Sequence, residues 1–236
     1  MPPVCRWAYL GRVDYDVALG WQRALLEARS RDAIADTLLL VEHPPVITLG
    51  RRASYDDILA EPAELAARGI AVHETNRGGL VTYHGPGQLV GYPIASIRGL
   101  TGGDVVRYVT GLEETLIRAL ATYGVAAGRD PVHHGVWTSD AKIAAVGVAI
   151  SRGVTMHGFA LNVCPDLAHF LLINPCGILD RGVTSLAAQG RPLAAIETIA
   201  TTLAAAFGAV FGRDMLQMAP AALRAELRRR ALAAAS

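Results

Sequence analysis

One cysteine, Cys176, stands in a setting that suits a nucleophile. It lies in the tripeptide Pro175-Cys176-Gly177, where proline restricts the backbone before the thiol and glycine permits a sharp turn after it. Such a turn leaves an amide N–H accessible as a donor to an oxyanion. The alternative role is that of a small buried apolar residue, and it applies equally to Cys5 and Cys164. Three cysteines without a C-x-x-C pair predict neither a disulfide framework nor a structural zinc site.

The second residue with chemical potential is Lys142, the single lysine among 22 lysines and arginines. A desolvated lysine can lose its proton at moderate pH, whereas an arginine effectively cannot. Lys142 directly precedes the apolar run 143–147, so we expect it at the start of a strand. This placement favours a proton-transfer role over that of an ordinary surface lysine.

A third feature is the glycine-rich stretch 77–93, which holds five glycines and two prolines around one arginine, one histidine and two tyrosines. Residues 80–83 and 89–92 are typical of short strands, and Gly-Pro-Gly at 85–87 is typical of a turn. The pattern predicts a hairpin that carries a cation and an imidazole near a glycine floor. A purely structural hairpin with a polar end is the alternative.

The histidines leave more than one interpretation open. His84 and His157 are candidates to hydrogen-bond in a pocket or to orient a substrate carbonyl, but a structural role suits either residue as well. His133 and His134 form a loop pair without a third ligand at useful spacing, so we expect no metal site.

The elements that must position these residues mix strands and helices without strict alternation. Helical spacing at Val17, Trp21 and Leu25 predicts one buried helix face, and Val106, Val109, Leu112, Leu116 and Leu120 predict another. The predicted strands are 4–13, 37–42, 46–49, 135–138 and the hairpin 142–151 with 154–163. The predicted helices are 15–29, 62–68, 103–123, 192–211 and 220–235, with a tight turn at 174–178. This order predicts an α+β fold, a mixed and mostly antiparallel sheet flanked by helices, in a single domain spanning residues 1–236.

Composition narrows the function classes. The 236 residues carry a formal net charge of +1, and no basic stripe typical of a nucleic-acid-binding protein is evident. The arginine cluster at 224–230 reads as a solvated helix face. The N-terminus lacks the pattern of a signal peptide, and the apolar window 192–211 suits a buried amphipathic helix better than a membrane span. We expect a soluble cytoplasmic protein without membrane or nucleic-acid partners.

Several segments occur together and in one order: Arg77–Gln88, Lys142–Gly147, His157–Val163, Pro175–Ile178 and Val183–Leu186. Together they resemble the lipoyl(octanoyl) transferase family, also called lipoate–protein ligase B, over about residues 35–190. The resemblance implies transfer of an octanoyl group from acyl carrier protein to a lysine of a lipoyl domain. Such domains belong to acyltransferase subunits of 2-oxoacid dehydrogenase complexes and to the glycine cleavage H protein. It also implies the fold of lipoate- and biotin-protein ligases, and we expect no cofactor.

The resemblance assigns roles position by position. Cys176 matches the acyl-thioester nucleophile, and Lys142 matches the partner that lowers the pKa of its thiol. The acyl-substrate pocket is implied at Arg77, Gly78, Gly79, Leu80, Val81, Thr82, Tyr83, His84, Ala145, Val146, Gly147, Gly158, Phe159 and Ala160. Arg51 and Arg52 would add positive charge near this site and help to dock acidic acyl carrier protein, although a solvated loop is the alternative.

Three other functions compete. An ATP-dependent lipoate or biotin ligase would share the fold, but Leu80 follows Arg77-Gly78-Gly79 where such an enzyme would favour a second basic residue, and no P-loop is present. A cysteine hydrolase using Cys176 with a histidine would release free acid. A non-catalytic acyl-carrier docking module would be unaffected by Cys176→Ser.

Overall fold

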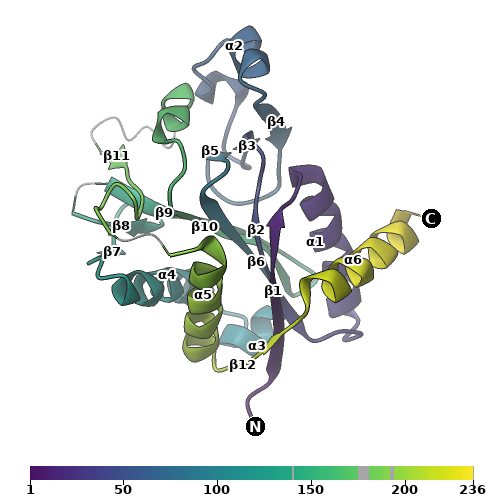
Figure 1. Cartoon of the computed structure of the whole chain (residues 1–236). Coiled ribbons are helices and arrows are strands. Elements are labelled where there is room, and N and C mark those ends of the chain that lie inside the picture. Colours follow the sequence, from purple (N-terminus) through teal and green to yellow (C-terminus); the bar gives the residue numbers. More distant parts are fainter. Residues whose placement is uncertain (140, 175–180, 192–193, 236) are drawn as a thin grey trace.

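The computed structural model describes residues 1–139, 141–174, 181–191 and 194–235, and two β-sheets organise this part of the chain (Figure 1). The larger sheet has the order β12-β1-β2-β6-β10-β9-β8-β7, and β11 pairs with β9. Its strands are β1 (Val4–Arg12), β2 (Asp36–Glu42), β6 (Gln88–Ile94), β7 (Gly128–Arg129), β8 (Val136–Trp137), β9 (Ala141–Ser151), β10 (Val154–Asn162), β11 (Gly182–Val183) and β12 (Asp214–Gln217). β1 runs parallel to β2 and β12, whereas each pair from β2 to β7 is antiparallel. The predicted mixed, mostly antiparallel sheet is confirmed.

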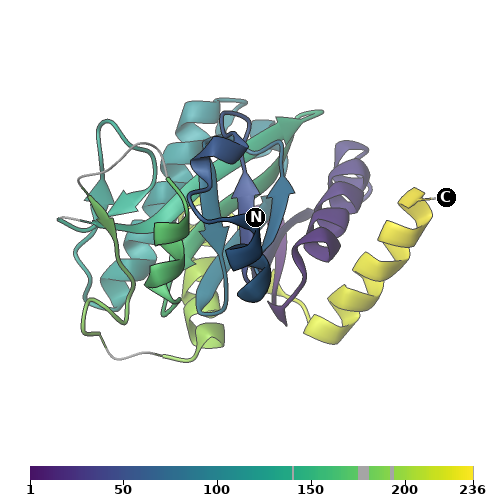
Figure 2. The ribbon, with the colours of Figure 1, turned by 90° about the horizontal axis from the view of Figure 1, so that it is seen from above.

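Helices cover both faces of this sheet (Figure 2). On one face α4 (Val105–Thr122) packs against α5 (Ile196–Phe211), and on the other α1 (Tyr15–Ser30) packs against α6 (Pro220–Ala235). A short helix, α3 (Ile97–Thr101), precedes α4. The α+β architecture predicted from the sequence is therefore present.

β2 shows why a central strand of this sheet is a continuous apolar run. Leu38 and Leu40 join the core beneath α4 and α5, whereas Leu39 and Val41 join the core beneath α1. Successive side chains of a strand point to opposite faces, and here both faces are covered. The buried strand predicted at 37–42 is confirmed.

The smaller sheet corrects one prediction. It has the order β4-β3-β5 and comprises β3 (Val46–Leu49), β4 (Ala71–Glu74) and β5 (Val81–His84). β5 pairs with β3, while β6 pairs with β2 and β10, so the predicted hairpin between 80–83 and 89–92 is wrong. Gly85-Pro86-Gly87 instead carries the chain from the small sheet to the large one. Gly87 has φ +83, and a Cβ there would lie 2.5 Å from the Cys164 carbonyl oxygen.

Short helical segments complete the small sheet's surroundings. They are a 3-10 turn η1 (Tyr55–Asp57), the helix α2 (Pro62–Ala67) and a second 3-10 turn η2 (Leu167–Leu172). Ile47, Val81, Tyr83 and Phe170 pack in the core between them.

Two helix faces differ from the predicted ones. Val17 is 45% exposed and Val106 is 75% exposed, although the spacing predicted both as buried. Val106 lies in the first turn of α4, and the buried side of this helix is made by residues such as Tyr108 and Leu112. α5 begins at Ile196, whereas α6 begins at Pro220 as predicted. Of the turn predicted at 174–178 the structure describes Asn174 alone.

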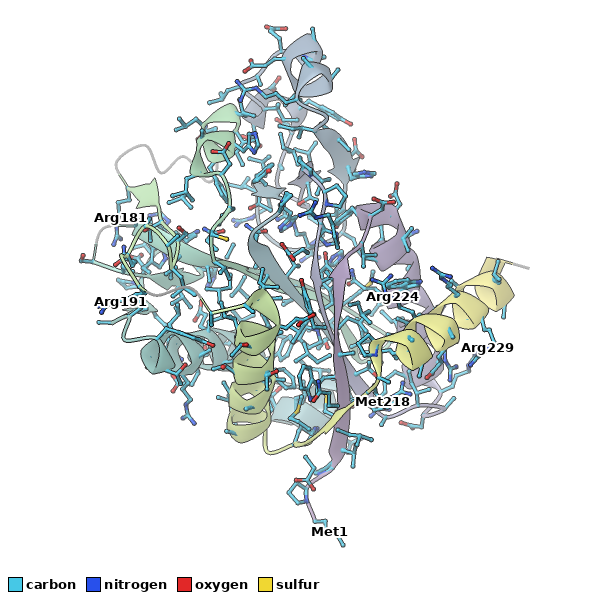
Figure 3. The ribbon with its side chains drawn as sticks, viewed as in Figure 1. Met1, Arg181, Arg191, Met218, Arg224 and Arg229 are labelled. Carbon is cyan, nitrogen blue, oxygen red and sulfur yellow. The ribbon has the colours of Figure 1, made fainter. Side chains whose placement is uncertain are left out.

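The arginine-rich helix α6 packs against α1. Arg224 and Arg229 lie across the molecule from Arg181 (Figure 3). Arg224 donates to the Leu10 carbonyl oxygen and lies over the Trp21 ring, so part of the predicted solvated cluster packs against the protein. In the ranges that the structure describes, no helix is long and apolar enough to cross a membrane.

Candidate active site

A cavity of about 730 Å³ is bordered by β5 of the small sheet, by β6, β9 and β10 of the large sheet, and by α4. Lys142 and every predicted pocket residue except Tyr83 border it. These pocket residues are Arg77–Thr82, His84, Ala145–Gly147 and Gly158–Ala160. Segments far apart in the sequence are therefore brought to one hollow.

Tyr83 is the predicted pocket residue that lies elsewhere. Its ring is buried in the core of the small sheet, where it packs against Phe170. Its hydroxyl lies 2.8 Å from Nδ1 of His169. Tyr83 therefore supports the small sheet, and its neighbour His84 borders the cavity.

The predicted catalytic pair is described in part. Cys176 lies outside the described residues, as does its neighbour Gly177. Lys142 is half-buried on β9, with Nζ 4.8 Å from the centroid of the Trp137 ring. The Arg181 guanidinium lies 4.5 Å from the same ring, so two cations flank this indole.

The strand that follows the Cys176 segment lies directly beside Lys142. β11 pairs with the start of β9, with Val183 opposite Lys142. The Thr184 amide then donates to the Lys142 carbonyl oxygen at 2.9 Å. The described chain after Cys176 therefore passes next to Lys142 at Gly182 and Val183.

The glycine-rich segment is fastened along the edge of β9. The Gly78 amide donates to the Val148 carbonyl oxygen at 2.8 Å. A Cβ on Gly147 would lie 2.9 Å from the Gly78 carbonyl oxygen, a contact that side chains essentially never make. Glycine at these positions therefore permits backbone to lie directly on backbone.

Arg77 is anchored on Thr48 of β3, and its Nη1 also donates to the Gly78 carbonyl oxygen at 3.1 Å. Its guanidinium donates to the Thr48 hydroxyl at 2.9 and 3.1 Å and to the Thr48 carbonyl oxygen at 2.5 Å. The side chain is buried and borders the cavity. It places a fixed positive charge beneath the glycine-rich segment.

Two buried histidines stand at the polar end of the cavity. His84 Nδ1 lies 2.6 Å from Gln88 Oε1, and the His84 ring stacks against Tyr15. His43 bridges the Val13 carbonyl oxygen and the Tyr92 hydroxyl at 2.6 and 2.7 Å. Burial lowers the pKa of His84 to about 3 and that of His43 to about 4. Both rings are therefore neutral near pH 7.

A chain of amide side chains continues from His84 across the large sheet. Gln88 Nε2 donates to Asn162 Oδ1 at 2.8 Å, and Asn162 Nδ2 donates to the Thr184 carbonyl oxygen at 3.0 Å. Gln88 and Asn162 are opposite one another on β6 and β10. The network therefore links the glycine-rich segment to the residue that binds the Lys142 backbone.

His157 occupies an unusual backbone conformation for a non-glycine residue, with φ +57. Its amide donates to Gln22 Oε1 at 2.9 Å, and its Nε2 lies 2.7 Å from Asn76 Oδ1. Burial and the Arg77 charge lower its pKa to about 4. The strained residue is thus held from both sides and fixes the loop directly before Arg77.

Another part of the cavity lining is apolar. Val105, Val106 and Val109 of α4 and Val146 and Phe159 of the sheet all border the cavity. Val105 and Val106 are 46% and 75% exposed. This wall could cover a short hydrocarbon chain, and its exposed valines would gain burial by doing so.

Charged residues surround the mouth. Arg51 and Arg52 are exposed, and Arg181 pairs with Asp130. The amides of His133 and Val132, with Arg181, lower the pKa of Asp130 to about 2. Among the residues that the structure places, no group of three metal-ligating side chains is present.

The sequence matches a known protein family over most of its length. Residues 14–208 match the model of the family described as "Lipoyl protein ligase A/B catalytic domain". The chain belongs to this family. An octanoyltransferase of Chloroflexus aurantiacus is 55% identical over 209 residues, which cover 87% of this chain and 93% of the relative.

Solved structures of ligases confirm the fold. The lipoate protein ligase of an archaeal lipoylation system from Thermoplasma acidophilum has a TM-score of 0.71 at 16% identity, covering 95% of this chain and 92% of the other. Biotin protein ligase from Aquifex aeolicus, solved with biotin and ATP, has a TM-score of 0.53 at 13% identity, covering 88% and 70%. At such identities the likeness concerns the fold alone.

Sequence reasoning missed several residues of this family member's site. Thr48 and Asn76 have no motif of their own in a single sequence, because each acts by holding another residue. His43 could have been noticed, because it stands directly before Pro44-Pro45, where a polar residue and two prolines interrupt an apolar run. Trp137 was also not identified from the sequence, because its contact with Lys142 depends on the pairing of β8 with β9.

Proposed function

We propose that this protein transfers an octanoyl group from octanoyl-acyl carrier protein to a lysine of lipoyl domains, through a thioester on Cys176. Acceptors would be the acyltransferase subunits of 2-oxoacid dehydrogenase complexes and the glycine cleavage H protein. The observation that carries the proposal is the 55% identity to an octanoyltransferase over nearly all of that relative. We further propose that residues 1–236 act as one domain, in the cytoplasm, without a cofactor.

The first half of the reaction exchanges one thioester for another. The Cys176 thiolate attacks the octanoyl carbonyl carbon, the bond to the carrier's sulfur breaks, and the carrier leaves as a thiolate that takes up a proton from the Lys142 ammonium, which leaves Lys142 neutral. A free thiol is mostly protonated at neutral pH, and a nearby ammonium lowers its pKa. Lys142 would supply that charge, and the adjacency of β11 to Lys142 supports the pairing.

The second half forms the amide. The acceptor lysine's neutral amine attacks the thioester, the bond to Cys176 sulfur breaks, and the amine proton passes to Lys142 or to the departing thiolate. The Gly177 amide is our candidate donor to the tetrahedral oxyanion, a contribution of about 2.7–4 kcal/mol. The octanoyl chain would lie along Val146 and Phe159, beneath the valines of α4.

The cavity's other features fit this substrate. The glycine-rich segment would let the acyl chain approach the backbone closely, and Arg77 would remain fixed on Thr48. Exposed Arg51 and Arg52 at the mouth would attract an acidic carrier protein.

The experiment that tests the proposal is a transfer assay with octanoyl-acyl carrier protein and a lipoyl domain in the absence of ATP. We expect octanoylation of the lipoyl domain by wild type and none by Cys176→Ser. Modification that requires ATP and free octanoate would instead establish a ligase. Release of octanoate without acceptor modification would establish a hydrolase.

A further inference from the structure

His84 has one ring nitrogen whose role the network leaves open. The side chain is 7% exposed and borders the cavity, and its Nδ1 is bonded to Gln88. Within the described parts of the chain, no protein group bonds Nε2 of His84. Nε2 is therefore the atom that a ligand in the cavity could meet.

Two backbone carbonyls determine what this atom can do. Asn162 bonds the Thr184 carbonyl oxygen at 3.0 Å, and Gln88 bonds the Tyr83 carbonyl oxygen at 3.3 Å. A carbonyl oxygen can only accept, so the NH₂ group of each amide side chain must face it. The orientation of both amides is thus fixed by the main chain.

The consequence passes along the chain of hydrogen bonds to the imidazole. With their NH₂ groups so placed, Asn162 presents Oδ1 to Gln88, and Gln88 presents Oε1 to His84. An amide oxygen also only accepts, so Nδ1 of His84 must carry the proton. In a neutral ring the other nitrogen, Nε2, is then an acceptor.

The surroundings keep the ring neutral. Burial is the main reason that the pKa of His84 falls to about 3, and His43, Arg77 and His157 oppose a second proton further. Tyr15, stacked on the ring, is the other titratable group that faces it.

We propose that Nε2 of His84 accepts a hydrogen bond from the ε-amino group of the acceptor lysine and so aims its lone pair at the acyl carbonyl. This inference rests on the function proposed above and concerns its second half-reaction. The expectation that His84 orients the acyl carbonyl is replaced, because this ring has no N–H left to donate to an oxygen.

The chemistry favours an amine over the other substrate groups. A neutral amine has two N–H bonds and one lone pair; holding one N–H fixes the direction of the lone pair. His84 is too weakly basic to take the proton of the amine that it binds. The proton lost by the amine during attack therefore goes to Lys142 or to the thiolate. Gln88 and Asn162 are positioning residues, which act through the tautomer of His84.

The placement is compatible with the same reaction centre. Gln88 and Asn162 lie on neighbouring strands, and Thr184, at the end of the network, donates to the Lys142 backbone. His84 and Lys142 both border the same cavity, so an amine bound there can meet Nε2 of His84 while its proton passes to Lys142.

The first test is the tautomer itself, by nitrogen-15 NMR of histidine rings in the unliganded protein. We expect Nδ1 protonated and Nε2 unprotonated near pH 7, with the signals assigned by their loss in His84→Phe. A ring protonated at Nε2 would overturn the inference. This measurement requires no substrate, so it stands even if octanoyl transfer fails.

The second test separates the two half-reactions in His84→Phe, which keeps a ring against Tyr15 but removes the acceptor. We expect acylation by octanoyl-acyl carrier protein within about fivefold of wild type and transfer to the lipoyl domain lowered about 100-fold, as for a lost oriented contact. The matched control is His73→Phe, which also contacts Tyr15 but does not border the cavity. Loss of acylation with normal transfer would assign Nε2 to the carrier's pantetheine amide, and unchanged rates would exclude both roles.

A third variant remains informative if His84→Phe does not fold. Gln88→Glu keeps an acceptor for Nδ1 and adds a negative charge, which should raise the pKa of His84 and place a proton on Nε2. Transfer should then fall as pH decreases and recover as it rises, while acylation changes little. A pH profile of transfer identical to that of wild type would contradict the inference.

Discussion

The two ends of the cavity are built in opposite ways. At the polar end His84, Gln88 and Asn162 are buried, and protein partners satisfy the bonding groups that fix their orientation. At the apolar end Val105 and Val106 of α4 remain exposed to solvent. The polar side chains are thus fixed by the protein itself, whereas the exposed valines would gain burial only from a bound ligand. Under the proposed function, position and specificity would then come from different parts of the cavity lining.

The largest effect should come from Lys142, which borders the cavity between these ends. Lys142→Arg keeps a positive charge but loses the ability to release a proton, so transfer should fall about 10²- to 10⁴-fold with little change in stability. Steady-state transfer rates measure this. Arg68→Lys, the reverse exchange on exposed α2, is the matched control. Wild-type rates in Lys142→Arg would exclude the proposed pair.

The polar end should make the fold sensitive to acid. The pKa values of His43, His84 and His157 lie near 4, 3 and 4, below the ordinary 6.5, so the unfolded chain binds more protons below pH 6.5. The stability that depends on these neutral histidines is fully present above pH 6.5 and is lost as pH falls towards 3. In that window each histidine lowers the free energy of unfolding by about 1.4 kcal/mol per pH unit. Urea unfolding at pH 7.5 and 5.0 measures the slope.

The exposed histidine His134 supplies the control for this slope. His134→Gln should leave the pH dependence of the unfolding free energy as it is in wild type. A stability that does not change between pH 7.5 and 5.0 would show that the polar end is not held as described.

A glycine-to-alanine substitution should destabilise the protein more where backbone packs closely beneath the cavity than at an open position. A Cβ on Gly158 would lie 2.3 Å from the Gly91 carbonyl oxygen, so Gly158→Ala should lower the free energy of unfolding by about 1–3 kcal/mol. Gly20, in α1, has no atom within 4 Å of such a Cβ. Gly20→Ala should raise stability by about 0.5–1 kcal/mol. Equal effects of the two substitutions would refute the contrast.

The smallest effect should be found at the apolar wall. Val106→Ser should raise KM for octanoyl substrates about 3- to 10-fold, because each buried methyl group contributes about 0.8 kcal/mol. Stability should hardly change, since the side chain is exposed without substrate. Val17→Ser, exposed on α1, is the control. An unchanged KM for octanoyl and longer acyl groups would show that the acyl chain does not bind against Val106.

Much of this arrangement could be predicted from the sequence, because it rests on local patterns. The buried strand at 37–42, the hairpin of β9 and β10 and the helix at 220–235 are confirmed. Lys142 and nearly all the predicted pocket residues meet at one cavity. Their motifs sit on glycine-rich turns and strand ends, which a single sequence marks clearly.

The wrong predictions concern features that tertiary contacts determine. The pattern at 80–92 fits a hairpin locally, but β5 finds its partner in β3 and β6 in β2. Val106 fits the apolar stripe of α4, yet this turn borders the cavity. Asn76 acts only through a distant partner, so no local signal could identify it. Asn162 lies in the segment 157–163 that carries the family resemblance, but its role depends on its contacts with Gln88 and Thr184.

Passage of the octanoyl group through Cys176 requires a covalent octanoyl adduct on this protein. Intact-protein mass spectrometry after mixing with octanoyl-acyl carrier protein, without ATP, detects such an adduct. We predict one added octanoyl group on wild type, its absence in Cys176→Ser, and its movement onto a lipoyl domain added afterwards. An unmodified wild-type protein that nevertheless octanoylates the lipoyl domain would contradict the thioester route.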